Sequence, residues 1–149
     1  MVIGFVSNKT FAGDVGSDTF DFAHFNLNHL SSYVDGNQIP SVAYSPDFVN
    51  DLYMREFVSL YRYMNQAEGI PQLDLLYKNY KNCVLYAFDY TTDGSVGSES
   101  GTLSLVKRGN IRVEVKFNTS LVAPIHMIVF AQFDNVIQID KYRNVTLDY

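Results

Sequence analysis

Apolar and charged residues alternate strictly along Ile111-Arg112-Val113-Glu114-Val115-Lys116-Phe117, with every odd position apolar and every even position charged. Because successive side chains of a β-strand point to opposite faces, this pattern gives one buried face and one solvated face. The same odd-position register continues at Ile125, Met127, Val129, Ala131 and Phe133. A period of two in both segments predicts half-buried, antiparallel strands.

Turn residues separate the other apolar segments at intervals of roughly ten residues, as in antiparallel sandwiches. Asp35-Gly36-Asn37 supplies the positive φ angles of a tight hairpin, and Lys107-Arg108-Gly109-Asn110 is a hairpin connection with glycine at the turn. We expect strands at residues 2–6, 20–25, 31–34, 38–40, 83–90, 103–106, 111–117, 125–133, 136–139 and 145–149. Residues 83–90 are nearly continuously apolar, which is typical of a strand covered on both faces.

One segment carries the periodicity of a helix. Ser45, Pro46 and Asp47 form a start signal, because serine can cap free amides, proline needs no amide at the first position, and aspartate favours the positive helix end. The apolar residues that follow have the spacing of one buried stripe: Val49, Leu52, Tyr53, Phe57, Leu60, Tyr61 and Met64. Gly69 and Pro71 are expected to end this helix.

The pattern as a whole predicts a mainly β fold, an antiparallel β-sandwich of the single jelly-roll type with one inserted amphipathic helix. A second, weaker helical turn is expected within residues 73–80. A fold of βαβ units is disfavoured, since it needs helices between most strands. The 149 residues suit one sandwich domain over residues 1–149, and strands at both ends are compatible with excision from a longer protein.

Composition limits the classes of partner. The net charge is −5 and the longest basic cluster is Lys107-Arg108, so sequence-wide nucleic-acid binding is not expected. Residues 1–6 lack the basic leader of a signal peptide, and no apolar stretch is long enough to predict a membrane span. The single cysteine, Cys83, lies in an apolar run and is expected to be a buried small hydrophobe.

The histidines give little indication of a metal or catalytic site. His24 and His29 are five residues apart, so on one strand they would face opposite sides and could not form a shared ligand cluster. His126 occupies an even position in a strand whose odd positions are apolar, and it is expected to face solvent or a partner.

The acidic residues and glycines likewise lack a recognised pattern. Asp14, Asp18 and Asp21 surround a glycine-containing loop, but their spacing misses the EF-hand pattern and favours turns. No Gly-x-Ser-x-Gly or phosphate-binding loop is present. We therefore expect no catalytic residues, no metal and no cofactor, and a protein that is not an enzyme.

Aromatic residues favour protein association. The chain has 11 tyrosines and 11 phenylalanines while only 18% of its residues are charged, and protein contacts favour aromatic side chains over charge at their centres. The aromatic stripe of the helix is expected to be core. The interface candidates are tyrosines near element ends: Tyr63, Tyr77, Tyr80, Tyr142 and Tyr149.

Two stretches resemble a known family. Residues 109–117 and 128–141, with Phe130-Ala131-Gln132-Phe133-Asp134-Asn135, are similar to the C-terminal region of virus-like structural proteins of Polinton (Maverick) elements and adintovirus-like genomes. Residues 2–13, 20–40 and 86–89 look like the same family. The resemblance implies a jelly-roll capsid or coat component that forms homo-oligomers or binds other coat proteins in a virion or virus-like particle assembled inside the host cell. A double jelly roll needs about twice the usual domain length, so this chain holds at most one roll.

Three functional hypotheses follow. The leading one is the structural coat domain. The second is an attachment or lectin-like module, in which residues 9–17 and 91–101 would contact a ligand. The third is an enzyme whose catalytic groups meet only in the fold.

Overall fold

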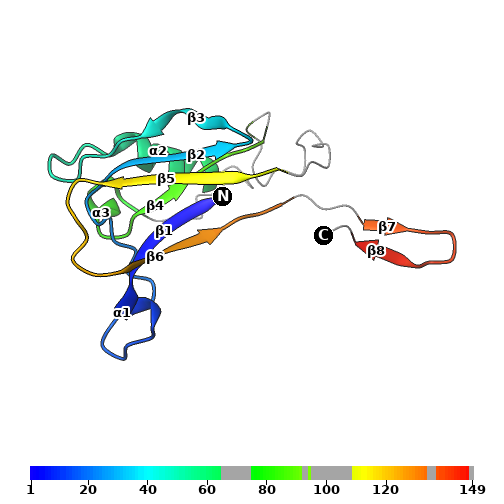
Figure 1. The fold of residues 1–149 in the computed structure, drawn as a ribbon, viewed down its shortest axis with the longest axis horizontal. Coiled ribbons are helices and arrows are strands. Elements are labelled where there is room, and N and C mark those ends of the chain that lie inside the picture. Colours follow the sequence, from blue (N-terminus) through cyan, green and yellow to red (C-terminus); the bar gives the residue numbers. More distant parts are fainter. Residues whose placement is uncertain (65–74, 92–93, 95–108, 134–136, 148–149) are drawn as a thin grey trace.

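The chain folds mainly into antiparallel β-sheet. A computed structural model describes residues 1–64, 75–91, 94, 109–133 and 137–147. Two three-stranded sheets lie as two layers over one core, and a two-stranded hairpin extends away from them (Figure 1). The predicted antiparallel, mainly β fold with few helices is confirmed.

The first sheet has the strand order β4-β1-β6. Its central strand is β1 (Val2–Ser7), which pairs antiparallel with β4 (Leu85–Ala87) and β6 (Ile125–Phe130). The expected strand at 83–90 forms a ladder only at its centre, but Val84, Tyr86, Ala87 and Phe88 are all buried, as predicted for a strand covered on both faces.

The second sheet has the order β3-β2-β5. Strands β2 (Leu27–Val34) and β3 (Asn37–Tyr44) form the predicted hairpin, with φ of +49° at Asp35 and +86° at Gly36. Strand β5 (Ile111–Phe117) has the bounds that its alternation predicts. Its even residues lie on the solvated face, where the Arg112 guanidinium stacks 4.4 Å above the Tyr33 ring.

Aromatic rings hold the two layers together. The Phe5 ring meets the Tyr86 ring of its own sheet and the Phe117 ring of the other sheet edge-on, at centroid distances of 6.3 and 6.0 Å. Tyr44 of β3 donates a hydrogen bond to the Ala87 carbonyl oxygen at 2.7 Å, which ties the second sheet to β4. The core therefore combines ring packing with a polar link between the sheets.

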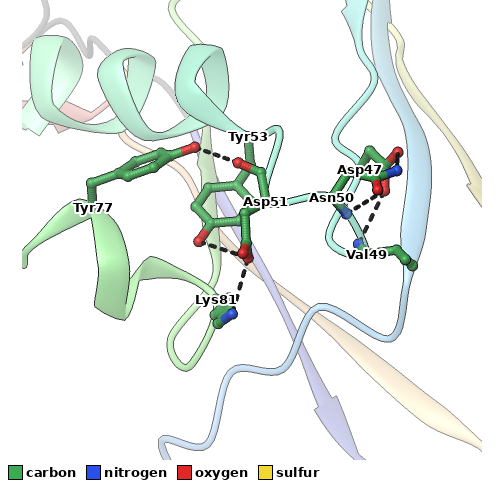
Figure 2. Close-up of polar contacts among 7 residues, drawn as sticks. All are labelled: Asp47, Val49, Asn50, Asp51, Tyr53, Tyr77 and Lys81. Carbon is green, nitrogen blue, oxygen red and sulfur yellow. Dashed lines mark hydrogen bonds and ion pairs between the residues drawn. The ribbon is translucent and has the colours of Figure 1, made fainter.

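The main helix, α2 (Met54–Met64), begins later than its start signal predicts. The Asp47 carboxylate accepts hydrogen bonds from the Val49 and Asn50 amides, and it thereby caps a turn instead of a helix (Figure 2). Val49 and Leu52 are therefore exposed, at 74% and 66%, and do not belong to the buried stripe. The expected end at Gly69 and Pro71 lies outside the described residues.

Residues 20–25, expected as a strand, do not form one. Positive φ angles at Phe25 and Asn26 interrupt the extended backbone. One backbone hydrogen bond joins this segment to Phe5 and one joins it to Val84. Phe22 packs on Gly4. The alternating pattern of residues 20–25 therefore reflects the packing of a loop residue and not pairing in a β-sheet.

Two short helices complete the described fold of the body. Helix α1 (Asn8–Phe11) was not expected, and its N-terminus is capped by the Ser7 hydroxyl oxygen, which accepts from the Thr10 amide at 3.0 Å. Helix α3 (Tyr77–Tyr80) lies within the predicted helical turn.

The hairpin beyond the two layers consists of β7 (Ile137–Ile139) and β8 (Val145–Leu147), near the expected strands. In the described residues these strands contact each other, and they share no extensive contact with another strand or helix. The expected strand at 103–106 lies outside the described residues.

Candidate functional site

The candidate site is a set of exposed apolar side chains on β6, on the segment after it and on the β7–β8 hairpin. We name it the C-terminal apolar surface. Its members are between 44% and 75% exposed: Met127, Val129, Phe130, Phe133, Ile137, Ile139, Tyr142 and Val145. A group of exposed apolar side chains marks an interaction site more often than a lone exposed leucine does. The surface therefore fits contact with another macromolecule.

Strand β6 is an open flank of the sandwich. It is the last strand of its sheet in the described part of the chain. Val129 and Met127 lie opposite Ile3 and Phe5 in the ladder and share their core-facing side of the sheet, yet each is 44% exposed. Ile3 and Phe5, by contrast, are 0% and 3% exposed. The core is thus sealed at β1 and partly uncovered at β6.

The hairpin carries a one-sided apolar face. Ile139 lies opposite Val145, and Ile137 is two residues before Ile139 on the same strand, so these three side chains share one face. They are 68%, 61% and 63% exposed, respectively. A lone two-stranded hairpin is at best marginally stable in water, and it normally packs on a third strand or a helix.

A carboxylate fixes the hairpin turn. Asp140 accepts hydrogen bonds from the amides of Tyr142 and Asn144 at 2.7 and 2.8 Å, and from the Asn144 side chain. The side-chain hydrogen bond from Asn144, followed by its backbone amide, holds the pKa of Asp140 below its usual value. Because this carboxylate stays ionised, it offsets one of the two positive charges of Lys141 and Arg143 at the tip.

The predicted interface tyrosines separate into three groups. Tyr142 is 74% exposed and belongs to the C-terminal apolar surface, whereas Tyr149 lies outside the described residues. Tyr63 and Tyr77 are half-buried and pack against the core. The interface prediction does not hold for Tyr80, which is fully buried and donates its hydroxyl to the Leu85 carbonyl oxygen at 2.7 Å.

Tyr77 takes part in an internal polar cluster. Its hydroxyl donates to the Asp51 carbonyl oxygen at 2.6 Å, and Lys81 forms an ion pair with the Asp51 carboxylate at 2.9 Å (Figure 2). The Tyr53 ring stacks beside Tyr77 at 4.8 Å. These contacts join the turn before α2 to α3, so the cluster has a structural role.

The three histidines are not brought together. His126, expected to face solvent or a partner, stacks on the exposed Phe11 ring at 4.1 Å and shares a hydrogen bond with the Asn8 side chain at 2.8 Å on the surface. His29 lies 4.0 Å from the Glu114 carboxylate across the β2–β5 pair. His24 stacks on the buried Phe48 ring at 4.3 Å.

His24 also lines an open pocket of about 390 Å³ between residues 24–26 and 119–125. Its Nδ1 accepts a hydrogen bond from the Asn26 amide at 2.9 Å, which leaves the proton of the neutral ring on Nε2. Burial, and secondarily the positive charge of Lys81, lower the pKa of His24. Ser7, Ser120 and Val122 also line this pocket, and its surface is mainly apolar.

The acidic loop forms turns. The Asp18 carboxylate accepts from the Phe20 amide at 2.9 Å, and the Asp14 carboxylate pairs with Lys9 at 2.6 Å. Cys83 is half-buried, and burial, followed by the charges of Asp21 and Asp18, raises its thiol pKa. Among the described residues no group of three or more histidine, cysteine or acidic side chains could hold a metal ion.

Two polar groups lie inside the aromatic core. Glu56 is 3% exposed and its pKa is raised, above all by burial. Tyr86 is fully buried and its hydroxyl has no hydrogen-bond partner among the described residues, and burial raises its pKa well above the usual value. Sequence reasoning missed the burial of Glu56, because a charged residue on a helix is normally solvated, whereas Tyr86 lies in the segment predicted to be covered on both faces.

Sequence reasoning also missed most of the C-terminal apolar surface. The alternation at Met127, Val129 and Phe133 predicted a covered face, and only Tyr142 was proposed as an interface residue. Residues 127–145 contain more apolar side chains than neighbouring strands can cover, and this excess was the available signal.

No family model matches the chain, and no solved structure matches it. The chain is similar to the uncharacterized protein F54H12.2 of Caenorhabditis elegans, with 21% identity over 152 residues. The match covers 99% of this chain and 36% of that protein, so the chain spans about a third of the relative's length. In the described residues, no helix is both long and apolar enough to cross a membrane.

Proposed function

We propose that this chain is a structural domain of a virus or virus-like element, a jelly-roll capsid or coat component that acts by oligomerising. The observation that carries the proposal is the C-terminal apolar surface, whose side chains are 44–75% exposed in the isolated chain. Association with further copies or with other coat proteins would remove this area from water, at a gain of about 25 cal/mol for each Å². The resemblance of residues 109–117 and 128–141 to coat proteins of Polinton elements points to the same role.

The single jelly roll is the form of sandwich that we propose. A jelly roll has eight antiparallel strands in two sheets, and the two layers here contain three antiparallel strands each. The location in a virion or virus-like particle is part of this proposal.

Sedimentation velocity combined with negative-stain electron microscopy tests the proposal. A coat component is expected to form discrete oligomers whose fraction rises with protein concentration. A chain that sediments as a sharp monomer at high concentration would overturn it.

A second candidate is an attachment or ligand-binding module. The pocket beside His24 favours it, because loops at one end of a sandwich hold ligands in many such domains. The expected contacting loop at 9–17 does not line this pocket, and most of the loop at 91–101 lies outside the described residues, so the ligand would be held by residues 24–26 and 119–125. A glycan array probed with the wild-type chain and with Ser120→Trp, which fills the pocket, tests this candidate. Binding lost in the variant supports it, and no binding by the wild type rejects it.

A further inference from the structure

We infer that the pocket beside His24 binds a small, uncharged molecule with an apolar body and a carbonyl oxygen, and that this oxygen accepts a hydrogen bond from His24. Such binding goes beyond the proposed coat role and does not depend on it. The pocket lies between residues 24–26 and 119–125. Its volume of about 390 Å³ is at the lower end of the range of small-molecule sites, roughly 300–1,000 Å³.

His24 offers a ligand one hydrogen-bond donor. Its Nδ1 accepts from the Asn26 amide at 2.9 Å, so the proton of the neutral ring is on Nε2. One face of the ring stacks on Phe48, and nothing in the described part of the chain accepts a hydrogen bond from Nε2. Protonation would place a hydrogen on Nδ1 and break the bond from Asn26. Burial and the charge of Lys81 lower the pKa of His24, which keeps the ring in the neutral form that this bond requires.

The lining favours an uncharged ligand. None of the described residues around the pocket carries a charge at neutral pH, so an ionised carboxylate or amine would lose hydration there without gaining an ion pair. The surface is mainly apolar, and Val122 in the pocket wall is fully exposed, so covering it with an apolar body is favourable. A sugar has more hydroxyls than this lining can pair. One donor beside an apolar wall therefore fits a neutral carbonyl compound such as an amide.

One wall of the pocket, the loop at 119–124, is held in place at both ends. At its start the Asn118 amide donates to the Asn26 carbonyl oxygen at 3.0 Å. At its end the Pro124 carbonyl oxygen accepts from the Asn8 amide at 3.1 Å. A site whose walls are already ordered loses less conformational freedom when a ligand binds, which favours binding of a small molecule.

The other wall contains a backbone conformation that is uncommon for residues with a side chain. Phe25 and Asn26 both line the pocket and have φ angles of +45° and +55°. Left-handed backbone at two successive residues other than glycine persists only where surrounding contacts impose it, and such conformations are concentrated at ligand sites. Here the contacts are the hydrogen bonds of Asn26 with His24 and Asn118. The strained turn therefore fixes the imidazole in one orientation.

NMR spectroscopy with three probes, each built on one six-membered ring, tests this binding. Cyclohexanecarboxamide has an apolar ring and a neutral carbonyl group. Cyclohexanecarboxylate has the same shape with a negative charge, and methyl glucoside has a ring covered with hydroxyls. We expect the amide to shift the signals of residues 24–26 and 119–125 with a Kd of roughly 1 mM, as for other molecules of this size. The other two probes should bind at least about fivefold more weakly.

His24→Asn and His29→Asn form a matched pair of variants. The asparagine introduced by the first can still accept from the Asn26 amide, as Asp18 accepts from the Phe20 amide two residues further on. Its side chain is too short to place a donor where Nε2 lies. We expect His24→Asn to weaken binding of the amide about three- to tenfold. His29 does not line the pocket, so His29→Asn should leave the Kd unchanged.

Ser120→Trp fills the pocket from its exposed loop and should abolish binding of the amide, which keeps the test decisive if His24→Asn does not fold. Preference for the amide, with a loss in His24→Asn and none in His29→Asn, supports the inferred site. Absence of binding, equal binding of the three probes, or tighter binding of the carboxylate or the glucoside overturns it. Unchanged affinity in a folded His24→Asn variant overturns the role of His24. Oligomeric state is a separate measurement, so the coat proposal can fail or succeed independently.

Discussion

The Glu56 side chain accepts a hydrogen bond through Oε1 from the Ser45 backbone amide at 3.1 Å, although Glu56 is only 3% exposed. The contact joins α2 to the chain that follows β3. A carboxylate in this position is desolvated, and burial raises its pKa above the usual value.

The raised pKa of Glu56 makes stability depend on pH. The folded chain binds this proton more tightly than the unfolded chain, so the stabilisation is complete below the unfolded pKa and is lost as pH rises through the folded pKa. Glu56→Gln keeps an acceptor for Ser45 and removes the charge. We expect its stability relative to wild type to increase between pH 4 and pH 8, as measured by urea unfolding at each pH. A difference in unfolding free energy between the variant and wild type that stays constant with pH would contradict this account.

Gly4 packs where a side chain cannot fit. A Cβ added at Gly4 would lie 2.5 Å from Cδ1 of Phe22 and 2.9 Å from Cδ2 of Leu85. Gly4→Ala is therefore expected to lower the free energy of unfolding by about 1–3 kcal/mol. Gly16→Ala is the matched control, because nothing lies within 4 Å of its added Cβ, and it should change stability by less than about 1 kcal/mol. Equal effects in thermal unfolding would argue against the packing described here.

The buried hydroxyls of Tyr80 and Tyr86 differ in their partners. Tyr80 donates to the Leu85 carbonyl oxygen, so Tyr80→Phe should cost about 0.5–1.5 kcal/mol. The Tyr86 hydroxyl has no partner, so Tyr86→Phe removes an unsatisfied group and is expected to be neutral or stabilising. Chemical denaturation of the two variants compares them directly. A larger loss in the Tyr86 variant than in the Tyr80 variant would show that the Tyr86 hydroxyl is satisfied in solution.

His24 should titrate below its ordinary pKa. Burial is the larger cause and the charge of Lys81 the smaller, so Lys81→Met is expected to raise the pKa of His24 without restoring the usual value. Because the folded chain binds this proton less tightly, the stabilisation from His24 is lost as pH falls through the folded pKa. NMR titration of the imidazole in both proteins measures the shift. A pKa that is unchanged in the variant would exclude the proposed influence of Lys81.

Much of the fold could be predicted because local patterns and burial agree. The alternation in residues 111–117 predicted β5 with its observed bounds. Asp35-Gly36 predicted the β2–β3 hairpin, because few other residue types adopt positive φ angles. The start of α2 was wrong, since the same Asp47 carboxylate can cap either a helix or a turn. The reciprocal backbone hydrogen bonds between Asp47 and Leu52, together with the contacts of Asp51 with Tyr77 and Lys81, favour the turn.

The candidate site was less predictable, because exposure depends on which strands meet. The apolar register of Met127 and Val129 indicates a core face, and nothing local to β6 reveals that the neighbouring flank is open. Tyr80 was proposed for an interface from its place at a helix end, but its ring packs inward between Tyr53 and Phe57. Tyr142 was identified because a hairpin tip is exposed in almost any arrangement.

Sedimentation equilibrium of three proteins tests most directly whether the C-terminal apolar surface drives association. Wild type and Val15→Lys, which adds a charge to a fully exposed loop, are expected to have the same oligomeric mass. Val129→Lys places the same charge on the open flank of β6 and should shift the mass towards the monomer, with circular dichroism unchanged. Equal oligomeric masses for all three proteins, or a monomeric wild type at every concentration, would contradict the account.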